Sequence, residues 1–365
     1  IIKFLYIRKM RIKNLEKLLD KKYCFLTARG CTSLFLLLKT LKLKNKKIII
    51  PANICHDVFM TIVISGNKPL PIDISNNYSL SYLDIKNNYD KNVGAILYPY
   101  MYGNVGNKIN IKKTIDFARK KNVYFIEDLA LSIGALYKKN TYVGSLSDYS
   151  ICSFGVGKII DLGYGGSINF NSEKFLKNFM IEKKKLKYYS KKELTALSNN
   201  FSVFSNKILN KKISKKKFDL GKIKFYKKLF VKKITFNDKY KINLTKQIKN
   251  IDITRNFLLL ASKKFNKYLR NKYITPINHT YNSVYWRKNY FIKRKFDELI
   301  YFLSENKVYV RNYFAPLNYF FPFLKTRFNH SEFFYKHVVN FWLKNETKTS
   351  DIKQINNLMS IFYKK

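Results

Sequence analysis

The chain has 365 residues, of which 46% are hydrophobic and 16% aromatic, with 13 Gly and 7 Pro. This composition excludes a disordered or collagen-like chain, and the length allows one large domain with a smaller partner, or two comparable domains. The 71 Lys and Arg against 23 Asp and Glu give a formal net charge of +48, a field that would attract nucleic acid, anionic membrane or phosphorylated substrates alike. The excess is mostly Lys and comes with abundant Asn, Ile, Tyr and Phe, so we interpret it as an A/T-rich codon preference.

The four cysteines, Cys24, Cys31, Cys55 and Cys152, form no CxxC pair and show no zinc-like spacing. This pattern predicts a reduced, intracellular protein without a metal site. The opening apolar run is too short for a signal peptide, and no run reaches the ~18–20 apolar residues that span a bilayer. We therefore expect a cytoplasmic protein without a membrane span.

Short apolar segments that alternate with helical or turn-like stretches fill the first half of the chain. The segment "CFLTARGCTSLFLLLKTLKL" passes from a short strand into an apolar helix. Further strands are predicted within "KKIIIPANI", "KPLPIDI", "VGAILYPY", "NVYFIEDLA" and "DYSICSFGVGK". Strands buried on both faces that alternate with helices predict an α/β fold with a mostly parallel sheet flanked by helices. In such sheets ligands bind at the carboxyl ends of the strands.

The second half of the chain has a different pattern. We expect a large domain over 1–245, whose part 175–245 is a lysine-rich helical elaboration, and a smaller C-terminal α+β domain over 246–365. In the smaller domain a long amphipathic helix begins near 246, and strands within 283–292 and 307–317 flank a helix over 293–306. The lysines concentrated at 211–240 predict a solvated face.

Asp128 and Lys158 stand at the ends of two predicted strands. Asp128 ends "NVYFIED" and Lys158 follows "SICSF", so both should lie at the same edge of the sheet. A lysine and a carboxylate placed in this way, with a Gly-Cys-Thr-Ser helix start upstream, suit pyridoxal phosphate. This cofactor needs an amine for its aldehyde, an anion for its ring nitrogen, and N–H groups with hydroxyls for its phosphate. For each residue taken alone the structural explanation is the stronger one: Asp128 as a strand-end cap and Lys158 as a surface lysine.

Six short motifs in fixed order make the stronger argument. The run "ILYPYMYGNVGNKINIKKTIDFARKKNVYFIEDLALSIGALYKKNTYVGSLSDYSICSFGVGKIIDLGYGGSINFNSE" resembles the DegT/StrS family of pyridoxal-phosphate-dependent nucleotide-sugar aminotransferases. The matching motifs are Tyr102-Gly103, Ile126-Glu127-Asp128, Gly134-Ala135, Gly144 to Asp148, Ser153 to Lys158, and Gly165-Gly166. Fainter resemblance covers most of residues 15–320, with a gap near 180–245.

The resemblance implies the fold of the aspartate aminotransferases, fold type I, and pyridoxal 5'-phosphate as cofactor. It implies that Lys158 holds the cofactor covalently and moves a proton during transfer, and that Asp128 pairs with the ring nitrogen. The phosphate would be held by Ser153 and by the helix start Gly30, Cys31 and Thr32. The substrates implied are an amino-acid donor, with glutamate expected, and a keto-sugar on a nucleotide. A cytoplasmic homodimer acting in polysaccharide or modified-sugar synthesis would follow.

Several positions depart from the family pattern. Leu131 stands where family members often carry Gln, and Cys55, with His56 beside it, stands where an aromatic residue stacks on the cofactor ring. Asn312 and Asn318 occupy positions where the family tends to have histidines. Asn199 and Asn200 are candidates for an asparagine that reaches the partner subunit's phosphate. Trp286 and Arg287 could contact substrate, although a strand aromatic is more often core.

These departures leave three alternatives open. The first is a relative that binds pyridoxal phosphate without transamination, which Leu131 and Cys55 would permit. The second is a sugar dehydratase, against which Lys158 argues because that chemistry uses a histidine there. The third, from another class, is a basic nucleic-acid-binding protein that uses the 211–240 lysines, although no specific nucleic-acid motif is present.

Overall fold

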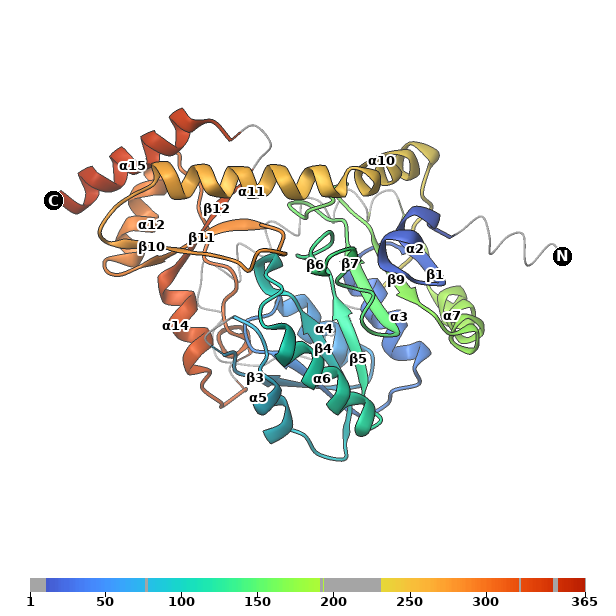
Figure 1. Ribbon diagram of the computed structural model, residues 1–365. Helices are drawn as coiled ribbons and strands as arrows, with labels where there is room; N and C mark the ends of the chain where they lie inside the picture. Colours follow the sequence, from blue (N-terminus) through green and yellow to red (C-terminus); the bar gives the residue numbers. More distant parts are fainter. Residues whose placement is uncertain are drawn as a thin grey trace.

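The computed structural model describes residues 11–75, 78–190, 193, 231–321, 323–343 and 347–364 (Figure 1). Within these ranges the strands form a seven-stranded sheet of order β1-β9-β8-β5-β4-β2-β3, a three-stranded sheet of order β10-β11-β12, and the small pair β6-β7. The prediction of a mostly parallel sheet with a smaller C-terminal sheet is thereby confirmed.

Parallel pairing dominates the large sheet. β2, β3, β4, β5 and β8 pair in parallel, and β9 alone runs antiparallel to both of its neighbours, β8 and β1. Helices connect β1 to β2, β2 to β3, β3 to β4 and β4 to β5, whereas the connection from β5 to β8 contains the pair β6-β7. The strands are β1 (Tyr23–Thr27), β2 (Lys47–Pro51), β3 (Lys68–Ile72), β4 (Val93–Pro99), β5 (Tyr124–Asp128), β8 (Tyr149–Ser153) and β9 (Gly166–Phe170).

Helices cover both faces of this sheet, because apolar side chains alternate from one face to the other along each strand. Ile48 and Ile50 of β2 pack with helices α3, α4 and α7, whereas Ile49 packs on the opposite face with α2, α5, α6 and α10. These helices are α2 (Lys13–Leu19), α3 (Gly30–Thr40), α4 (His56–Ile64), α5 (Tyr82–Asn87), α6 (Lys108–Lys120), α7 (Glu173–Lys185) and α10 (Asp238–Lys249). The short elements η1 (Met101–Gly103), β6 (Leu136–Lys138) and β7 (Thr141–Tyr142) lie in the connecting loops.

The C-terminal sheet differs from the prediction in one strand. The segment 283–292 contains β11, but 307–317 forms no strand, and Arg311 makes only an isolated bridge with Asn340. The side chain of Asn340 accepts the backbone N–H of Tyr313 at 2.5 Å, which takes that donor from any further ladder. Strands β10 (Ile274–Ile277) and β12 (Val338–Trp342) flank β11 (Arg287–Ile292) instead, and α12 (Phe296–Glu305), α13 (Leu317–Phe320), α14 (Asn329–His337) and α15 (Thr349–Lys364) complete this part.

The long helix predicted near 246 is a pair of helices. α10 begins at Asp238, and after Asn250 the chain continues as α11 (Ile251–Tyr268). The two helices run along one side of the molecule, from the large sheet to the C-terminal sheet (Figure 1). The predicted boundary at 245 falls inside α10, so the division into domains stays a prediction.

Part of the lysine-rich stretch lies outside the described residues. Of 175–245, α7 and α10 are helical as expected, while 194–230, with Asn199 and Asn200, is not described. No helix in the described ranges is both long and apolar enough to cross a membrane.

Candidate active site

The predicted site residues gather at the carboxyl edge of the large sheet. Asp128 is the last residue of β5 and Ser153 the last of β8, and the two strands are parallel neighbours. Lys158 follows five residues later in a turn, where its backbone N–H donates to the Gly155 carbonyl at 3.2 Å. The sheet edge therefore brings Asp128, Ser153 and Lys158 together, as their places at the strand ends predict.

The N-terminus of α3 lies against Ser153. A Cβ on Gly30 would come within 3.0 Å of the Cβ of Ser153 and 3.4 Å of its Oγ. Arg29, which precedes the helix, provides no side-chain cap. Such a helix start favours an anion through its first-turn N–H groups and its dipole. Gly30, Cys31 and Thr32 thus form, with the Ser153 hydroxyl, a place suited to a phosphate.

Gly166 makes this close approach possible. A Cβ at this position would lie 2.6 Å from the Cys152 carbonyl oxygen and 2.7 Å from the backbone N of Gly30. Both neighbours are backbone atoms, which cannot turn aside as a side chain can. The glycine therefore sets the distance between β9 and the start of α3.

Lys158 is half-buried beside the ring of Trp286. Its Nζ is 5.9 Å from the ring centroid of Trp286. Burial lowers the pKa of Lys158 from 10.5, and the charge of Arg287 acts in the same direction, while Cys55 and Asp128 oppose the shift. A lysine whose pKa is lowered is uncharged more often near neutral pH, and only the uncharged amine attacks a carbonyl.

Asp128 is a buried carboxylate with little local compensation. Its side chain is 4% exposed, and Oδ1 accepts the N–H of Ala130 at 2.9 Å. Burial raises the pKa of Asp128, while that hydrogen bond and the charge of Lys158 lower it. A carboxylate in such surroundings is stabilised by a cation placed beside it.

Glu127, the preceding residue, has a different environment. Its Oε1 accepts from the Tyr100 hydroxyl and from the Gly144 N–H, both at 2.7 Å, and its Oε2 accepts from the N–H groups of Leu146 at 2.9 Å and Ser147 at 3.0 Å. The side chain is fully buried and binds the turn that follows β7. The sequence analysis assigned Glu127 no role. The available signal was that Glu127 and the turn it binds both belong to the ordered motifs, Ile126-Glu127-Asp128 and Gly144 to Asp148.

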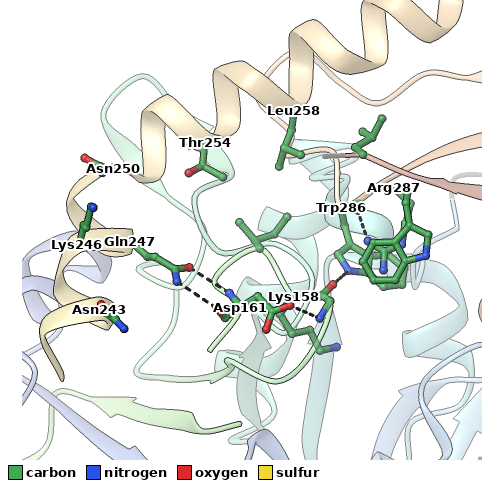
Figure 2. A pocket seen from close by; sticks show the side chains of 14 residues that line it. Lys158, Asp161, Asn243, Lys246, Gln247, Asn250, Thr254, Leu258, Trp286 and Arg287 are labelled. Carbon is green, nitrogen blue, oxygen red and sulfur yellow. Dashed lines mark hydrogen bonds between the residues drawn. The ribbon is translucent and has the colours of Figure 1, made fainter. Parts of the chain in front are cut away.

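Asp161 organises the loop that carries Lys158. Its two carboxylate oxygens accept the N–H groups of Gly157 at 2.6 Å and Gly163 at 2.9 Å. The backbone of Asp161 also exchanges two hydrogen bonds with the side chain of Gln247 from α10, at 3.2 and 3.1 Å (Figure 2). Sequence reasoning missed this residue, although an Asp between glycines is a common turn signal.

A cavity of about 520 Å³ opens beside Lys158. One wall consists of the loop with Gly157 and Asp161, and another of Trp286, Arg287 and Trp342. Figure 2 shows α10 and α11 across from the loop, with Gln247 reaching Asp161. The lining polar residues of these helices are Asn243, Lys246, Gln247, Asn250 and Thr254.

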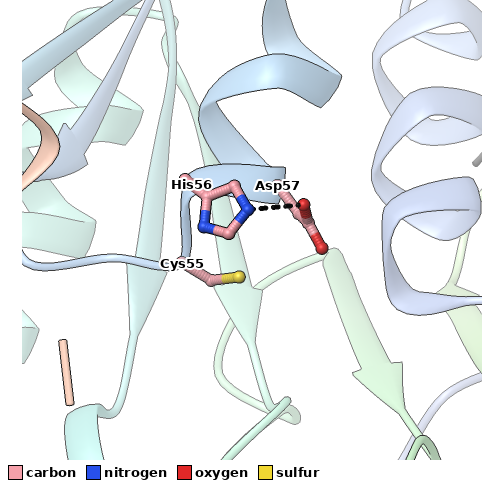
Figure 3. Close-up of side chains that lie close together, drawn as sticks. All are labelled: Cys55, His56 and Asp57. Carbon is pink, nitrogen blue, oxygen red and sulfur yellow. Dashed lines mark ion pairs between the residues drawn. The ribbon is translucent and has the colours of Figure 1, made fainter. Parts of the chain in front are cut away.

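The departures from the family pattern lie in and around this site. Lys158 and Cys55 affect each other electrostatically, and burial raises the pKa of the Cys55 thiol. The Nε2 of His56 lies 3.2 Å from Asp57 Oδ1 (Figure 3), and the ring centroid of His56 is 4.9 Å from that of Phe320. The idea that His56 replaces a stacking aromatic residue stays a prediction.

Three other departures have structural contacts. Leu131 packs in an apolar cluster with Met101, Tyr102 and Trp286. The amide groups of Asn312 and Asn318 donate to the Tyr335 carbonyl at 3.3 Å and to Glu332 Oε1 at 2.8 Å. Both asparagines are thus bound to α14.

Three nearby side chains, those of Cys55, His56 and Asp57, carry donor atoms that lie within 4.8 Å of one another, a group that could hold a metal ion. They are consecutive residues at the start of α4, and two of them already pair with each other. The expectation of no metal site stays a prediction.

Comparisons with known proteins agree with this geometry. The model of the DegT/DnrJ/EryC1/StrS aminotransferase family matches residues 12–202. GDP-perosamine synthase of Escherichia coli O157:H7 is 28% identical over 170 residues, which are 46% of this chain and 45% of that protein. GDP-perosamine synthase of Caulobacter vibrioides is 26% identical over 154 residues, 42% and 40% of the two chains. The chain thus spans less than half the length of these curated relatives.

Solved structures match over nearly the whole chain. Helicobacter pylori PseC, an aminotransferase involved in the biosynthesis of pseudoaminic acid, superimposes with a TM-score of 0.76 at 14% identity, covering 98% of this chain and 91% of that one. NtdA from Bacillus subtilis with bound cofactor PMP gives a TM-score of 0.71 at 17% identity, covering 98% and 77%. At these identities the likeness establishes the fold.

Proposed function

Because the chain belongs to the DegT/DnrJ/EryC1/StrS aminotransferase family, we propose that it is a pyridoxal-phosphate-dependent sugar aminotransferase. The reaction would move an amino group from an amino acid, with glutamate as the expected donor, to a keto-sugar carried on a nucleotide. The observation that carries this proposal is the meeting of Lys158, Asp128 and the start of α3 at one sheet edge. The two GDP-perosamine synthases among the relatives support a nucleotide sugar as acceptor.

The residues present fit the cofactor. Asp128 is buried and stabilised by a cation, which a protonated ring nitrogen would supply. The uncapped start of α3 and the Ser153 hydroxyl suit a phosphate. Lys158 has the lowered pKa that an attacking amine needs. When bound, pyridoxal phosphate would supply an electron sink for the donor's Cα–H bond.

The chain's own residues would then have distinct tasks. Lys158 Nζ would hold the cofactor through its aldehyde carbon, whose oxygen would leave as water. Once displaced by the amine of the donor, Nζ would move the proton of the donor's Cα to the cofactor. Asp128 would keep the ring nitrogen protonated, since a buried carboxylate favours a charged neighbour. Gly30, Cys31, Thr32 and Ser153 would hold the phosphate, and so fix the ring over the sheet edge.

One observation favours a second candidate. The thiol of Cys55 acts electrostatically on Lys158, and apolar Leu131 lies in the cluster with Trp286. A protein that binds pyridoxal phosphate without transferring amino groups would show the same cofactor contacts. The fate of the cofactor after an amino donor is added separates the two candidates.

The experiment is reductive labelling of the protein loaded with pyridoxal phosphate. Borohydride treatment followed by peptide mapping should place the cofactor on Lys158, and Lys158→Ala should remove the label. Lys246→Ala is the matched control, because Lys246 lines the same cavity, and it should keep the label. Label on a different lysine would contradict the assignment.

The Asp128→Asn variant separates attachment of the cofactor to Lys158 from transfer of the amino group. This variant should still be labelled at Lys158, because the amine is intact, but should lose most transfer from glutamate. Loss of the cofactor's visible absorption band on adding glutamate measures that transfer. Wild-type protein that is labelled yet unchanged by glutamate would favour the second candidate.

We further propose that the protein is a cytoplasmic homodimer, as the resemblance implies. Sedimentation of the loaded protein tests the oligomeric state.

A further inference from the structure

Arg287 is an arginine buried between two tryptophans. Its guanidinium carbon is 3.2 Å from the ring centroid of Trp342 and 4.3 Å from that of Trp286, and the residue is 4% exposed. Trp286 is itself fixed, because its Nε1 donates to the Gly157 carbonyl at 2.6 Å. The aromatic faces hold the guanidinium in one plane, which suits a ligand that binds side-on.

The guanidinium has few partners of its own among the described residues. One nitrogen, Nη1, donates to the Trp286 carbonyl at 3.0 Å, and no described carboxylate forms an ion pair with Arg287. Asp161 acts on it only at a distance, and both oxygens of Asp161 already accept from backbone N–H groups. Burial lowers the pKa of Arg287 to about 10, so it stays charged near neutral pH. A buried charge without a paired anion is costly, and a bound carboxylate would offset that cost.

This charge lies beside the reactive lysine. A Cβ on Gly157, the residue before Lys158, would come within 3.1 Å of Arg287 Nη2 and 2.7 Å of Trp342 Cη2. Lys158 and Arg287 line the same cavity (Figure 2). A small molecule with an amine near Lys158 can therefore place an acidic group on Arg287.

We propose that Arg287, held between Trp286 and Trp342, binds a carboxylate of the amino-acid donor. The inference rests on the proposed function, because it specifies the donor side of that same site. Arginine binds a carboxylate through two parallel N–H donors. The Trp286 carbonyl uses one N–H of Nη1, and Nη2, on the Gly157 side, donates to no described residue.

The surroundings favour a carboxylate over a nucleotide diphosphate. A diphosphate carries more negative charge than one guanidinium neutralises, and Lys246 is the one further cation besides Lys158 among the described lining residues. Amides dominate the opposite wall: Gln247 is hydrogen-bonded to Asp161, and Asn243 and Asn250 lie beside it. Such a wall suits the remaining polar groups of an amino acid.

The two tryptophans make the subsite directly measurable. The whole sequence contains 2 Trp, and both contact Arg287, so tryptophan fluorescence reports on this place alone. Glutarate has two carboxylates but no amine, so it can occupy the subsite without reacting. Titration of the purified, cofactor-loaded protein with glutarate, at ionic strength held constant with sodium chloride, should give a saturable change.

Three variants test the assignment. Arg287→Gln should weaken glutarate binding by about 10- to 100-fold, because hydrogen bonds to a charged group are lost. Arg287→Lys should bind glutarate with an affinity between those of wild type and Arg287→Gln, since it keeps the charge but not the paired donors. Arg294→Gln is the matched control, because Arg294 also stacks on an aromatic ring, 3.8 Å from the centroid of Tyr273, and does not line the cavity; it should bind as wild type.

Each outcome decides the inference. Circular dichroism first establishes which variants are folded. If Arg287→Gln is not folded, the glutarate titration of Arg287→Lys decides the inference in its place. A folded Arg287→Gln that binds glutarate as wild type overturns the inference, as does GDP saturating the fluorescence change at concentrations where glutarate does not. If Lys158 is not labelled by borohydride, the proposed function fails and the donor role with it. Labelling at Lys158 together with unaltered glutarate binding in the variant defeats this inference alone.

Discussion

Glu127→Gln replaces one carboxylate oxygen by an amide nitrogen in a fully enclosed site. If the nitrogen takes the place of Oε2, it faces the N–H groups of Leu146 and Ser147. If it takes the place of Oε1, the Tyr100 hydroxyl can turn to accept, but the Gly144 N–H still faces a donor. The second orientation is the less costly, and it leaves one buried N–H without an acceptor.

The cost follows from these contacts. An unsatisfied buried donor costs about 1–3 kcal/mol, and hydrogen bonds to a neutral acceptor are weaker by about 1 kcal/mol each than those to a charged one. With the bonds from Leu146 and Ser147 retained but neutral, the sum is about 3–5 kcal/mol. That loss is a large fraction of the free energy of unfolding of an ordinary domain, about 5–15 kcal/mol.

Urea unfolding followed by circular dichroism measures the effect. Glu173→Gln is the control, because Glu173 is an exposed carboxylate paired with Lys22, and its midpoint should stay near that of wild type. Glu127→Gln should unfold at a clearly lower urea concentration. Equal midpoints for the two variants would refute the view that Glu127 fixes the turn by its charge.

Two further predictions concern the lysine and the start of α3. Gly166→Ala should weaken pyridoxal phosphate binding more than it changes the far-ultraviolet circular dichroism, because the added Cβ would push the start of α3 from β9; a cofactor titration that matches wild type would contradict this. Because burial lowers the pKa of Lys158 below 10.5, the unfolded chain binds more protons between the lowered and the ordinary pKa, so stability should rise with pH in that window. Lys158→Met should remove that part of the slope, and unfolding midpoints measured across the window would show an unchanged slope if the lysine is not dehydrated.

The sequence allowed the central part of the site to be predicted. Asp128 and Lys158 both follow apolar runs, and parallel strands bring such positions to one edge whatever the remaining packing. The family resemblance pointed to Gly30, Cys31, Thr32 and Ser153, and the structure places the helix start at Gly30 against the strand end at Ser153; their role toward a phosphate stays a prediction. The placement of these residues at one edge follows from the order of the strands along the chain and from their direction, and both can be inferred from the sequence.

The cavity wall around Arg287 could not be predicted in the same way. Trp342 reaches Arg287 from β12, whereas the sequence pattern placed the neighbouring strand at 307–317. That error arose because an apolar run resembles a strand whether or not its N–H groups are taken, and here a side chain of Asn340 takes one. This wall of the cavity forms by packing between segments that are distant in the sequence, and no local sequence pattern indicates such a contact.

The helix pair α10 and α11 gives the cavity a fixed depth. Gln247 of α10 is bonded to Asp161 in the lysine loop, and Arg255 of α11 donates to the Gly134 carbonyl at 3.0 Å. Farther along α11, the ring of Phe265 packs 5.5 Å from that of Phe341, next to Trp342 in β12. The two helices thus connect the loop that carries Lys158 with strand β12, which packs against Arg287. If the donor is bound as proposed, the distance between Lys158 and Arg287 would set which length of dicarboxylate reaches both groups.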